Sequence, residues 1–505
     1  MSVLDLQRLR AEGQAFMELI SRETYLAYAG LKKTAELQPI YEQYKDILGE
    51  EALELTLDAF HSATENTDDR RSAQALLDFE IESQAAKPLA ALDEREIEWE
   101  NSAFIRSPDG RVISYQAAPI EIANTSDRTL RLALDQARTK LVKEEHAPIR
   151  LERLQREKDY IESLGVAGDY NASFEAVSGI SLGALGASCE RFLRDTDSMW
   201  SDTLPRVLKK HLGIKPSQAK RSDALALFRA SEYDDAFPGN EMETVMRRQV
   251  LEMGIDPTAD GRIIFDVGER EGKRSRAFCS PVRVPEEVYL VLRPHGGQSD
   301  YNTFLHELGH ALHYGYASPD YPFEFRWLGD NSVTEAYAML FDHRMQDRGW
   351  LLRYTGLGTN RVGKFLRTAG FEELHFLRRY CAKFLYERTL YSGEVRWSDL
   401  PDLYVQLLSK ATGFEYDAAD AFVDVDPRYY SARYLRAWQL QSILNEELTS
   451  RFDMDWFRNP SAGPWITNEL FAQGQRETAD EIATRAGAGT LSFQPLIRKI
   501  ESLLA

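Results

Sequence analysis

Apolar residues recur at helical spacing along most of the chain. From Leu4 to about His61 they lie among many Glu, Gln and Lys residues, and a similar pattern covers 129–164 and 180–211. Side chains three and four positions apart share one face of a helix, so this pattern predicts amphipathic helices. The helical periodicity returns after Asp300 and continues towards the C-terminus.

Two short regions depart from this helical pattern. Residues 102–124 contain two strand-like runs on either side of Pro108-Asp109-Gly110, which is a turn sequence and predicts a β-hairpin. Residues 263–292 contain further strand-like runs separated by glycines and prolines. The sequence therefore predicts a mainly α protein with a small β-sheet just before a C-terminal helical region.

The length of the chain predicts more than one packed unit. A single hydrophobic core rarely serves 505 residues, so we expect an N-terminal mainly helical domain over 1–190 and a second domain over 191–505. The chain has 61 basic and 80 acidic residues, giving a net charge of −19. This acidic balance would repel phosphates and argues against a nucleic-acid partner.

The cysteines and the apolar runs bear on the compartment. Cys189, Cys279 and Cys381 are too scattered for a disulfide framework or a thiolate zinc site, which favours a reducing compartment. The sequence near Met1 lacks the charged and apolar regions of a secretory signal, and no run of about 18 apolar residues is present. We expect a cytoplasmic protein without a membrane partner; the oligomeric state is left open.

The strongest chemical signal is the sequence His306-Glu307-Leu308-Gly309-His310. Residues four apart lie one turn above each other on a helix, so the two imidazoles can bind one metal ion from the same side. Glu307 lies about 100° round the helix. There it can take a proton from a water at the open metal position.

The residues around this motif favour a helix with two different faces. Ser299 or Asp300 can cap its N-terminus after the glycine pair at 296–297. One face is apolar and should be buried; it comprises Tyr301, Phe304, Leu305, Leu308 and Leu312. The opposite face presents His306, His310 and His313 and should line a cleft.

A catalytic zinc ion needs a third protein ligand, which leaves a fourth position for water. The metzincin continuation is absent, because its third ligand position is Tyr316. Glu335 lies 25 residues after His310 in a run of helical character, and we expect it to be the third ligand of one Zn²⁺ ion. Asp342 is two turns further and could orient a ligating imidazole by a hydrogen bond. For His313 we expect a supporting or packing role, since a fourth ligand would close the site to water.

At this point the sequence resembles the thimet oligopeptidase and oligoendopeptidase F family of gluzincin zinc peptidases. Residues 303–313 are similar to the zinc-binding helix of that family, and the interval to Glu335 also matches. Segments 265–279 and 474–481 look like the strand at its substrate-binding edge and its C-terminal helices. The resemblance spans roughly 260–500, while the N-terminal half shows only helical character.

The family also carries tyrosines on a late helix that are thought to donate hydrogen bonds to the tetrahedral oxyanion. Tyr430 and Tyr434 are one turn apart in the matching segment, which begins near Pro427. Phenol donors aimed at developing negative charge suit such a transition state. The histidine that usually precedes these tyrosines is missing, and a third tyrosine position is occupied by Ala437. Packing of two aromatic side chains on a helix is the alternative interpretation.

The resemblance implies a mainly α, two-part ellipsoid with a deep channel that admits flexible peptides and excludes folded proteins. It also implies that 191–505 is the catalytic domain, a zinc endopeptidase acting on internal bonds of short unfolded peptides. Glu307 would take a proton from the zinc-bound water and pass it to the leaving amine.

Two alternatives stay open at this point. One is a related zinc carboxypeptidase, in which Arg433 or Arg436 would bind the peptide C-terminus. The other is a peptide-binding homologue with little turnover, against which the intact Glu307 counts. The sequence does not give the cleavage preference.

Overall fold

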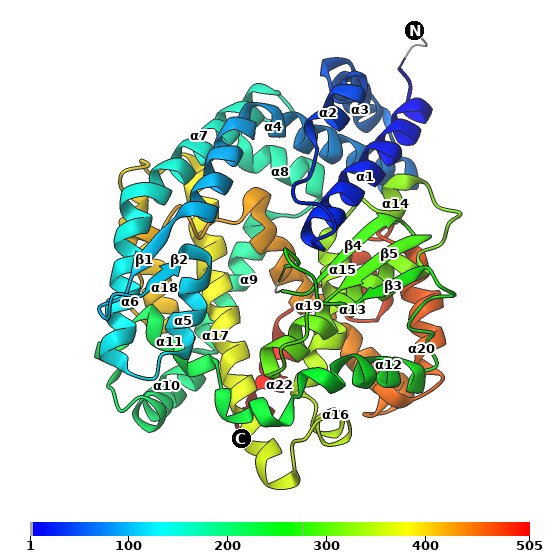
Figure 1. Cartoon of the computed structure of the whole chain (residues 1–505). Coiled ribbons are helices and arrows are strands. Elements are labelled where there is room, and N and C mark those ends of the chain that lie inside the picture. Colours follow the sequence, from blue (N-terminus) through cyan, green and yellow to red (C-terminus); the bar gives the residue numbers. More distant parts are fainter. Residues whose placement is uncertain (1–3, 275) are drawn as a thin grey trace. The chain divides into compact units, whose positions relative to one another are not determined.

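The computed structural model describes residues 4–274 and 276–505, and helices make up most of it (Figure 1). The helical spacing in the N-terminal stretches and after Asp300 corresponds to helices in the structure. The prediction of a mainly α fold with a small β-sheet is confirmed. The N-terminal residues 1–3, used above to judge a secretory signal, lie outside the described residues.

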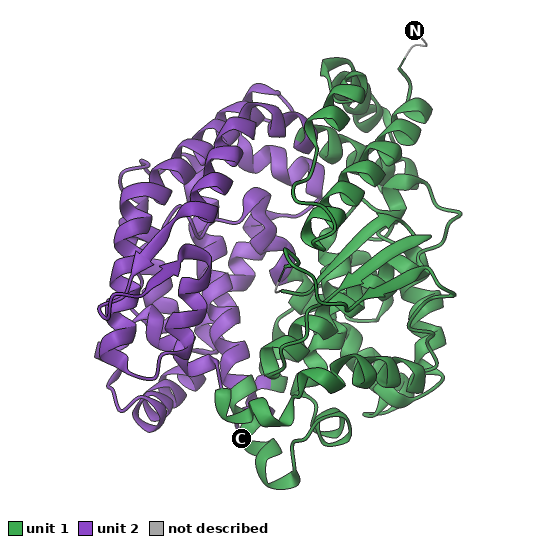
Figure 2. Ribbon diagram, in the orientation of Figure 1, with its two compact units in different colours: residues 1–81, 231–369, 436–499 green, residues 82–230, 370–435, 500–505 purple. Residues whose placement is uncertain are grey.

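Contacts within the chain define two compact units, which Figure 2 colours separately. Unit 1 comprises 1–81, 231–369 and 436–499, and unit 2 comprises 82–230, 370–435 and 500–505. Each unit therefore draws residues from both sides of residue 190. A unit defined by contacts need not coincide with an independently folding domain, so the expected domains 1–190 and 191–505 stay a prediction.

The helices fall into three groups by unit. Unit 1 contains α1 (Leu6–Tyr28), α2 (Gln38–Gln43), α3 (Glu50–Ser62), α12 (Met242–Glu252), α13 (Gln298–Tyr316), α14 (Phe323–Arg326), α15 (Asn331–Asp342), α16 (Arg348–Tyr354), α20 (Ala462–Trp465) and α21 (Ala479–Arg485). Unit 2 contains α5 (Ala118–Asn124), α6 (Arg128–Leu141), α7 (Ala147–Ser163), α8 (Tyr170–Ser178), α9 (Leu182–Asp195), α10 (Asp197–His211), α11 (Arg221–Phe228) and α18 (Leu400–Thr412). Residues of both units occur in α4 (Asp68–Ser102), α17 (Thr359–Ser392), α19 (Tyr430–Phe452) and α22 (Gln494–Leu504).

The small sheet of unit 1 lies next to α13 (Figure 1). Its strand order among the described residues is β3-β5-β4. Strand β3 (Ile263–Asp266) is parallel to β5 (Glu287–Val291), and β4 (Phe278–Arg283) is antiparallel to β5. Because β5 is central, β4 is an edge strand, and α13 packs against both. The expected sheet before the motif helix is thus present.

The predicted hairpin is also present, in unit 2. Strands β1 (Phe104–Arg106) and β2 (Val112–Ser114) pair antiparallel, with Ile105 opposite Ile113. Both isoleucines are buried, whereas their strand neighbours are exposed. This alternation is what a strand with one face on a core requires.

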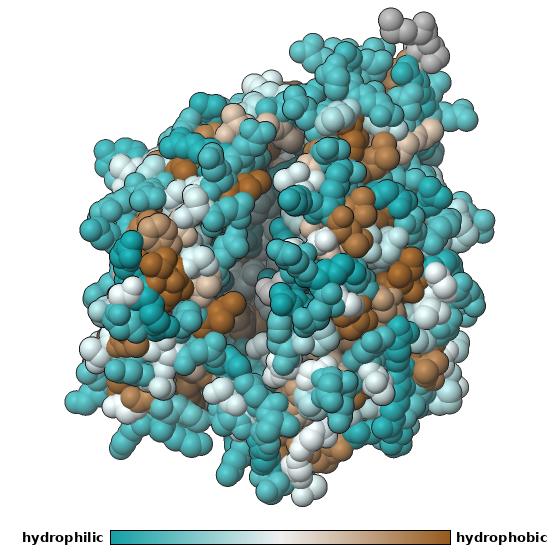
Figure 3. Space-filling view, in the orientation of Figure 1, coloured by the Kyte–Doolittle hydropathy of each residue, from teal (hydrophilic) through white to brown (hydrophobic). Residues whose placement is uncertain are grey.

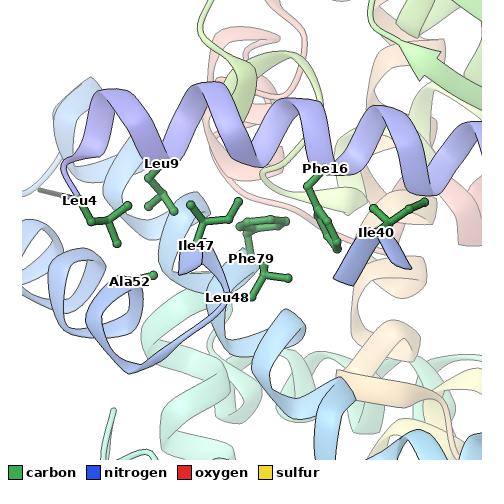
Figure 4. Packing of buried hydrophobic residues seen from close by; sticks show 8 residues of the cluster. All are labelled: Leu4, Leu9, Phe16, Ile40, Ile47, Leu48, Ala52 and Phe79. Carbon is green, nitrogen blue, oxygen red and sulfur yellow. The ribbon is translucent and has the colours of Figure 1, made fainter. Parts of the chain in front are cut away.

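A hydrophobic cluster packs α1 against α2, α3 and the start of α4 in unit 1 (Figure 4). Its buried members are Leu4, Leu9, Phe16, Ile40, Ile47, Leu48, Ala52 and Phe79. The Phe16 ring meets Tyr41, Tyr44 and Phe79 in edge-to-face contacts at 5.2, 5.9 and 6.3 Å between ring centroids. The periodic apolar residues of α1 therefore form a core rather than a partner surface.

The molecular face seen in Figure 3 is mostly hydrophilic, with hydrophobic residues scattered across it. Large exposed hydrophobic side chains such as Leu31, Ile97 and Met454 lie in separate parts of the chain. Single exposed apolar side chains are ordinary on a folded protein. None of the helices formed by the described residues combines the length and the apolar character needed to cross a membrane.

Phe16→Ala should lower the free energy of unfolding by about 3–5 kcal/mol, because it removes a buried ring and leaves a cavity in a tightly packed cluster. Leu31→Ala is the control, since Leu31 is 50% exposed and its loss should change stability by less than about 0.5 kcal/mol. Urea unfolding followed by circular dichroism measures both variants. Equal effects of the two substitutions would contradict this description of the core.

Candidate metal centre

Helix α13 presents the motif because its other face is fixed in the core. Tyr301, Phe304, Leu305, Leu308 and Leu312 are all at most 1% exposed, as the spacing predicts. His306 and His310 remain partly exposed, but His313 is completely buried, so the expectation that it lines a cleft is wrong.

The start of α13 also differs from the prediction. Its N-cap residue is Gly297, with φ of 89°, and neither Ser299 nor Asp300 caps the helix. The Asp300 carboxylate instead accepts the backbone N–H groups of His295 and Gly296, at 2.7 and 2.9 Å. It therefore fixes the preceding glycine turn rather than the free N–H groups of the helix.

Gly309 allows α13 and α15 to approach closely. A Cβ atom at this position would lie 2.6 Å from the Cα of Ala338 and 3.0 Å from the carbonyl oxygen of Tyr337. Real Cβ atoms do not tolerate such distances, so the two small residues set the spacing of the helices. This spacing places Glu335, three residues before Ala338, opposite the histidines of α13.

The structure brings His306, His310 and Glu335 together as the sequence predicts. The Nε2 atoms of the two histidines are 3.2 Å apart. The Glu335 Oε2 atom is 3.2 Å from His306 Nε2 and 3.7 Å from His310 Nε2. Zinc–ligand bonds of about 2.0–2.1 Å in tetrahedral geometry require ligand atoms about 3.3–3.4 Å apart, which these distances approximate.

Both imidazoles are oriented through their other nitrogen. His306 Nδ1 lies 2.8 Å from Asp342 Oδ2, and His310 Nδ1 lies 2.9 Å from Thr334 Oγ1. A carboxylate only accepts hydrogen bonds, so His306 Nδ1 must donate to Asp342. Such a bond directs the lone pair of Nε2 towards the centre of the triad, as metal-binding histidines require. The orienting contact expected of Asp342 is present in the structure.

The buried carboxylates give the centre a negative field. Burial alone would lower the pKa of His306, but hydrogen bonds to Asp342 and Glu335 raise it well above its ordinary value. Burial alone would raise the pKa of Glu335, but the nearby imidazoles of His310 and His306 lower it strongly. The centre therefore keeps an ionised carboxylate at Glu335 and favours a positive charge on His306. A divalent cation would compete with the proton for this position.

Glu307 is oriented by the edge strand β4. The backbone N–H of Cys279 donates a hydrogen bond of 2.8 Å to Glu307 Oε2. Because β4 packs on α13, the sheet fixes the direction in which this carboxylate points. Burial and the Glu307 charge raise the pKa of the Cys279 thiol well above its ordinary value, so the thiol stays protonated beside this acid.

Tyr430 and Tyr434 lie in the first turns of α19, and their ring centroids are 4.9 Å apart. Both are partly exposed, while the adjacent Tyr429 is completely buried and donates its hydroxyl to Asn171. Both predicted tyrosines belong to unit 2, whereas the histidine–glutamate triad belongs to unit 1. Their role towards the oxyanion stays a prediction, and Tyr429 is the weaker candidate of the three.

A second group of possible metal ligands occurs in unit 2, formed by Glu96, Glu100 and His146. There, Arg150 already pairs with Glu96 at 3.3 Å, and both His146 nitrogens have partners in Glu96 and Tyr115. A guanidinium next to the carboxylate opposes binding of a cation. Of these two groups among the described residues, the triad on α13 and α15 is the better candidate.

Sequence reasoning missed three groups of the centre. Thr334 contacts His310, the Cys279 N–H contacts Glu307, and the carbonyl oxygen of Gly474 contacts His313. A threonine directly before Glu335 was the one visible signal, since the turn of a helix places it beside the same partner helix. The two backbone groups have no signature in side-chain patterns.

Comparison with known proteins agrees with this architecture. No family model matches the chain, and no curated protein matches its sequence. Among solved structures, a provisionally assigned peptidase from Chlamydophila abortus aligns with a TM-score of 0.67 at 15% identity, over 99% of this chain and 90% of that one. The structure of a protein called BsuCP aligns with a TM-score of 0.59 at 14% identity, over 98% of both chains. The chain shares its fold with these proteins. At this identity the likeness establishes the fold, and the chemistry rests on the residues described above.

Gly309→Ala should lower the free energy of unfolding by about 1–3 kcal/mol, because its methyl group would overlap the backbone of α15. Gly363→Ala in α17 is the matched control, since a Cβ there meets only the tip of Arg367 at 4.0 Å. Replacing that helical glycine should stabilise the protein by up to about 1 kcal/mol. Opposite signs in denaturant unfolding would confirm the close contact, whereas stabilisation by both substitutions would contradict it.

Proposed function

We propose that this protein is a zinc-dependent metallopeptidase that hydrolyses internal peptide bonds of short unfolded peptides. The observation that carries the proposal is the triad of His306, His310 and Glu335. Its three candidate ligand atoms lie 3.2, 3.2 and 3.7 Å apart, close to the spacing of a tetrahedral zinc site, and both imidazoles are held by bonds to Nδ1.

The donor set fits zinc on chemical grounds. Two imidazole nitrogens and one carboxylate oxygen, with a fourth position for water or substrate, are a usual ligand set of catalytic Zn²⁺. The centre lies among ionised carboxylates that offset the charge of a cation. When bound, Zn²⁺ supplies Lewis acidity that polarises a carbonyl group and makes water more acidic.

In this proposal Glu307 is the general base and then the general acid. Its carboxylate accepts the proton of the attacking water and delivers it to the nitrogen of the leaving amine. The hydrogen bond from the Cys279 N–H to Oε2 restricts rotation of the carboxylate. Tyr430 and Tyr434 are assigned, as donors, to the negative charge that develops on the carbonyl oxygen.

A peptide substrate is favoured by the position of β4. This strand is at the edge of the sheet, and it packs against the helix that carries His306 and His310. An extended peptide can add to such an edge through main-chain hydrogen bonds, which do not depend on its sequence. A peptide bound in this way would run past Glu307.

Incubation with a mixed pool of unfolded peptides should produce internal cleavages that a chelator abolishes and added Zn²⁺ restores. Mass spectrometry of the pool identifies the new termini, and His306→Ala, His310→Ala or Glu335→Ala should each remove both bound zinc and activity. Loss of only one or two C-terminal residues would favour the carboxypeptidase alternative. Zinc binding without any cleavage would favour the peptide-binding alternative.

The structure bears on the carboxypeptidase alternative through one residue. Arg436 already pairs with Asp330 at 3.2 Å and with Asp480 at 2.8 Å. These bonds tie Arg436 to the N-cap of α15, where the Asp330 side chain accepts the N–H of Ser332. A guanidinium in this position supports α15, the helix that carries Glu335, which counts against Arg436 as the residue that binds a peptide carboxylate.

Glu307→Gln should lower kcat by about 10²-fold to 10⁴-fold while zinc remains bound, because the amide cannot accept a proton. Steady-state hydrolysis of a fluorogenic peptide and elemental analysis measure the two quantities. Glu50→Gln, at an exposed position of α3, is the control and should change neither. A Glu307→Gln protein with normal kcat would exclude this residue as the base.

Tyr430→Phe and Tyr434→Phe should each lower kcat by about 10²-fold to 10³-fold without loss of zinc, since one donor to the oxyanion is removed. Tyr429→Phe serves as the comparison, because the buried hydroxyl of Tyr429 bonds to Asn171. Loss of that hydroxyl should lower the free energy of unfolding by about 1 kcal/mol and leave kcat unchanged. Kinetics and thermal unfolding separate these effects. If Tyr429→Phe alone impaired turnover, the assignment would be one residue out of register.

A further inference from the structure

A continuous chain of hydrogen bonds runs from the backbone of Gly474 to His310 in unit 1. His313 Nε2 lies 3.1 Å from the Gly474 carbonyl oxygen, and His313 Nδ1 lies 3.1 Å from Thr334 Oγ1. The same hydroxyl lies 2.9 Å from His310 Nδ1. His313 is completely buried and Thr334 is 3% exposed, so water does not compete for these positions.

The donor and acceptor of each hydrogen bond follow from the Gly474 carbonyl oxygen at one end of the series. A carbonyl oxygen only accepts, so His313 Nε2 must carry a hydrogen. Burial holds His313 in its neutral form and lowers its pKa to about 3, which leaves Nδ1 as an acceptor. The single hydrogen of the Thr334 hydroxyl is therefore donated to His313, and the oxygen of Thr334 accepts from His310 Nδ1.

The conformation of Gly474 fixes the carbonyl group at which this series of hydrogen bonds ends. Its φ and ψ are 57° and −128°, a region that side chains disfavour, and a Cβ would lie 2.3 Å from the Phe325 carbonyl oxygen. Glycine is thus needed here for the carbonyl group to point at His313. The backbone around Gly474 is also fixed on the other side, where the Gln475 N–H donates to Phe325 at 2.7 Å.

We propose that this series of hydrogen bonds, here called the relay, holds His310 in one tautomer, with hydrogen on Nδ1 and an unprotonated Nε2. The relay is formed by Gly474, His313 and Thr334. His313 and Thr334 are thereby positioning residues for a metal ligand. The inference rests on the proposed function in one respect, namely that the bare Nε2 serves zinc. The two histidines of the motif are then oriented by different kinds of group. The Nδ1 of His306 donates to the charged carboxylate of Asp342, whereas the Nδ1 of His310 donates to the uncharged hydroxyl of Thr334, which adds no charge to the centre.

The tautomer can be read in the metal-free protein by NMR of ¹⁵N-labelled histidine, with the His310 signals assigned from His310→Gln. We expect His310 to show a protonated Nδ1 and an unprotonated Nε2. In Thr334→Val, which keeps the shape and removes the hydroxyl, this preference should weaken. Zinc affinity, measured by competition with a chelator, should fall about 10-fold to 100-fold in the same variant.

Two variants separate positioning from a general loss of packing. Thr334→Ser restores the hydroxyl and should recover the tautomer and bring zinc affinity within a few-fold of the original. Thr56→Val removes another fully buried threonine hydroxyl of unit 1, which bonds to the Ala52 carbonyl oxygen at 3.0 Å, and should alter neither readout.

Hydrogen on Nε2 of His310 in the unsubstituted protein would overturn the relay, and so would unchanged zinc affinity in Thr334→Val. If Thr334→Val fails to fold, the tautomer of the unsubstituted protein decides the question alone. A protein with the expected tautomer that binds no zinc would support the relay and contradict the proposed function. The two proposals can therefore fail separately.

Discussion

The candidate centre depends on the close packing of α13 against α15 at Gly309 and Ala338. Without that approach, the carboxylate of Glu335 could not come within about 4 Å of imidazoles on another helix, since a larger side chain would separate the backbones. The apolar face of α13 and the largely buried helix α15 hold the two helices in this arrangement. The core thus fixes the positions of the three candidate ligand atoms.

The neighbouring residues then determine the charge of each candidate ligand. Asp342 and Glu335 are buried carboxylates whose pKa values stay low because imidazoles partner them, although burial alone would raise those values. A buried negative charge without a cation is costly, so the centre favours protons or a metal ion. The Nδ1 atoms of His306 and His310 bond to Asp342 and Thr334, so the Nε2 atoms of both rings face the same point.

Much of this centre could be predicted from the sequence, because its ligands follow from helix periodicity. The spacing of His306 and His310 and the helical run around Glu335 are local patterns, and so was the alternation that predicted the strands. A supporting or packing role was expected for His313, but the side chains that bury it, Phe471 and Tyr337, could not be predicted because they come from elsewhere in the chain.

Groups that act through the backbone were beyond sequence reasoning altogether. The Cys279 N–H and the Gly474 carbonyl group depend on tertiary placement of the main chain, for which side-chain patterns carry no signal. The helix cap at Gly297 was missed for a related reason, since Asp300 bonds to the preceding turn instead of the helix. The sequence also did not indicate which residues form each of the two units, because each unit is assembled from segments far apart in sequence.

The central claim is that one zinc ion is held by His306, His310 and Glu335. An anomalous difference map from a crystal of the zinc-loaded protein, recorded at the zinc absorption edge, tests it most directly. The account predicts one peak about 2.0–2.2 Å from Nε2 of each histidine and from a carboxylate oxygen of Glu335. A peak bound by other residues, or no peak at this triad in fully loaded protein, would contradict it.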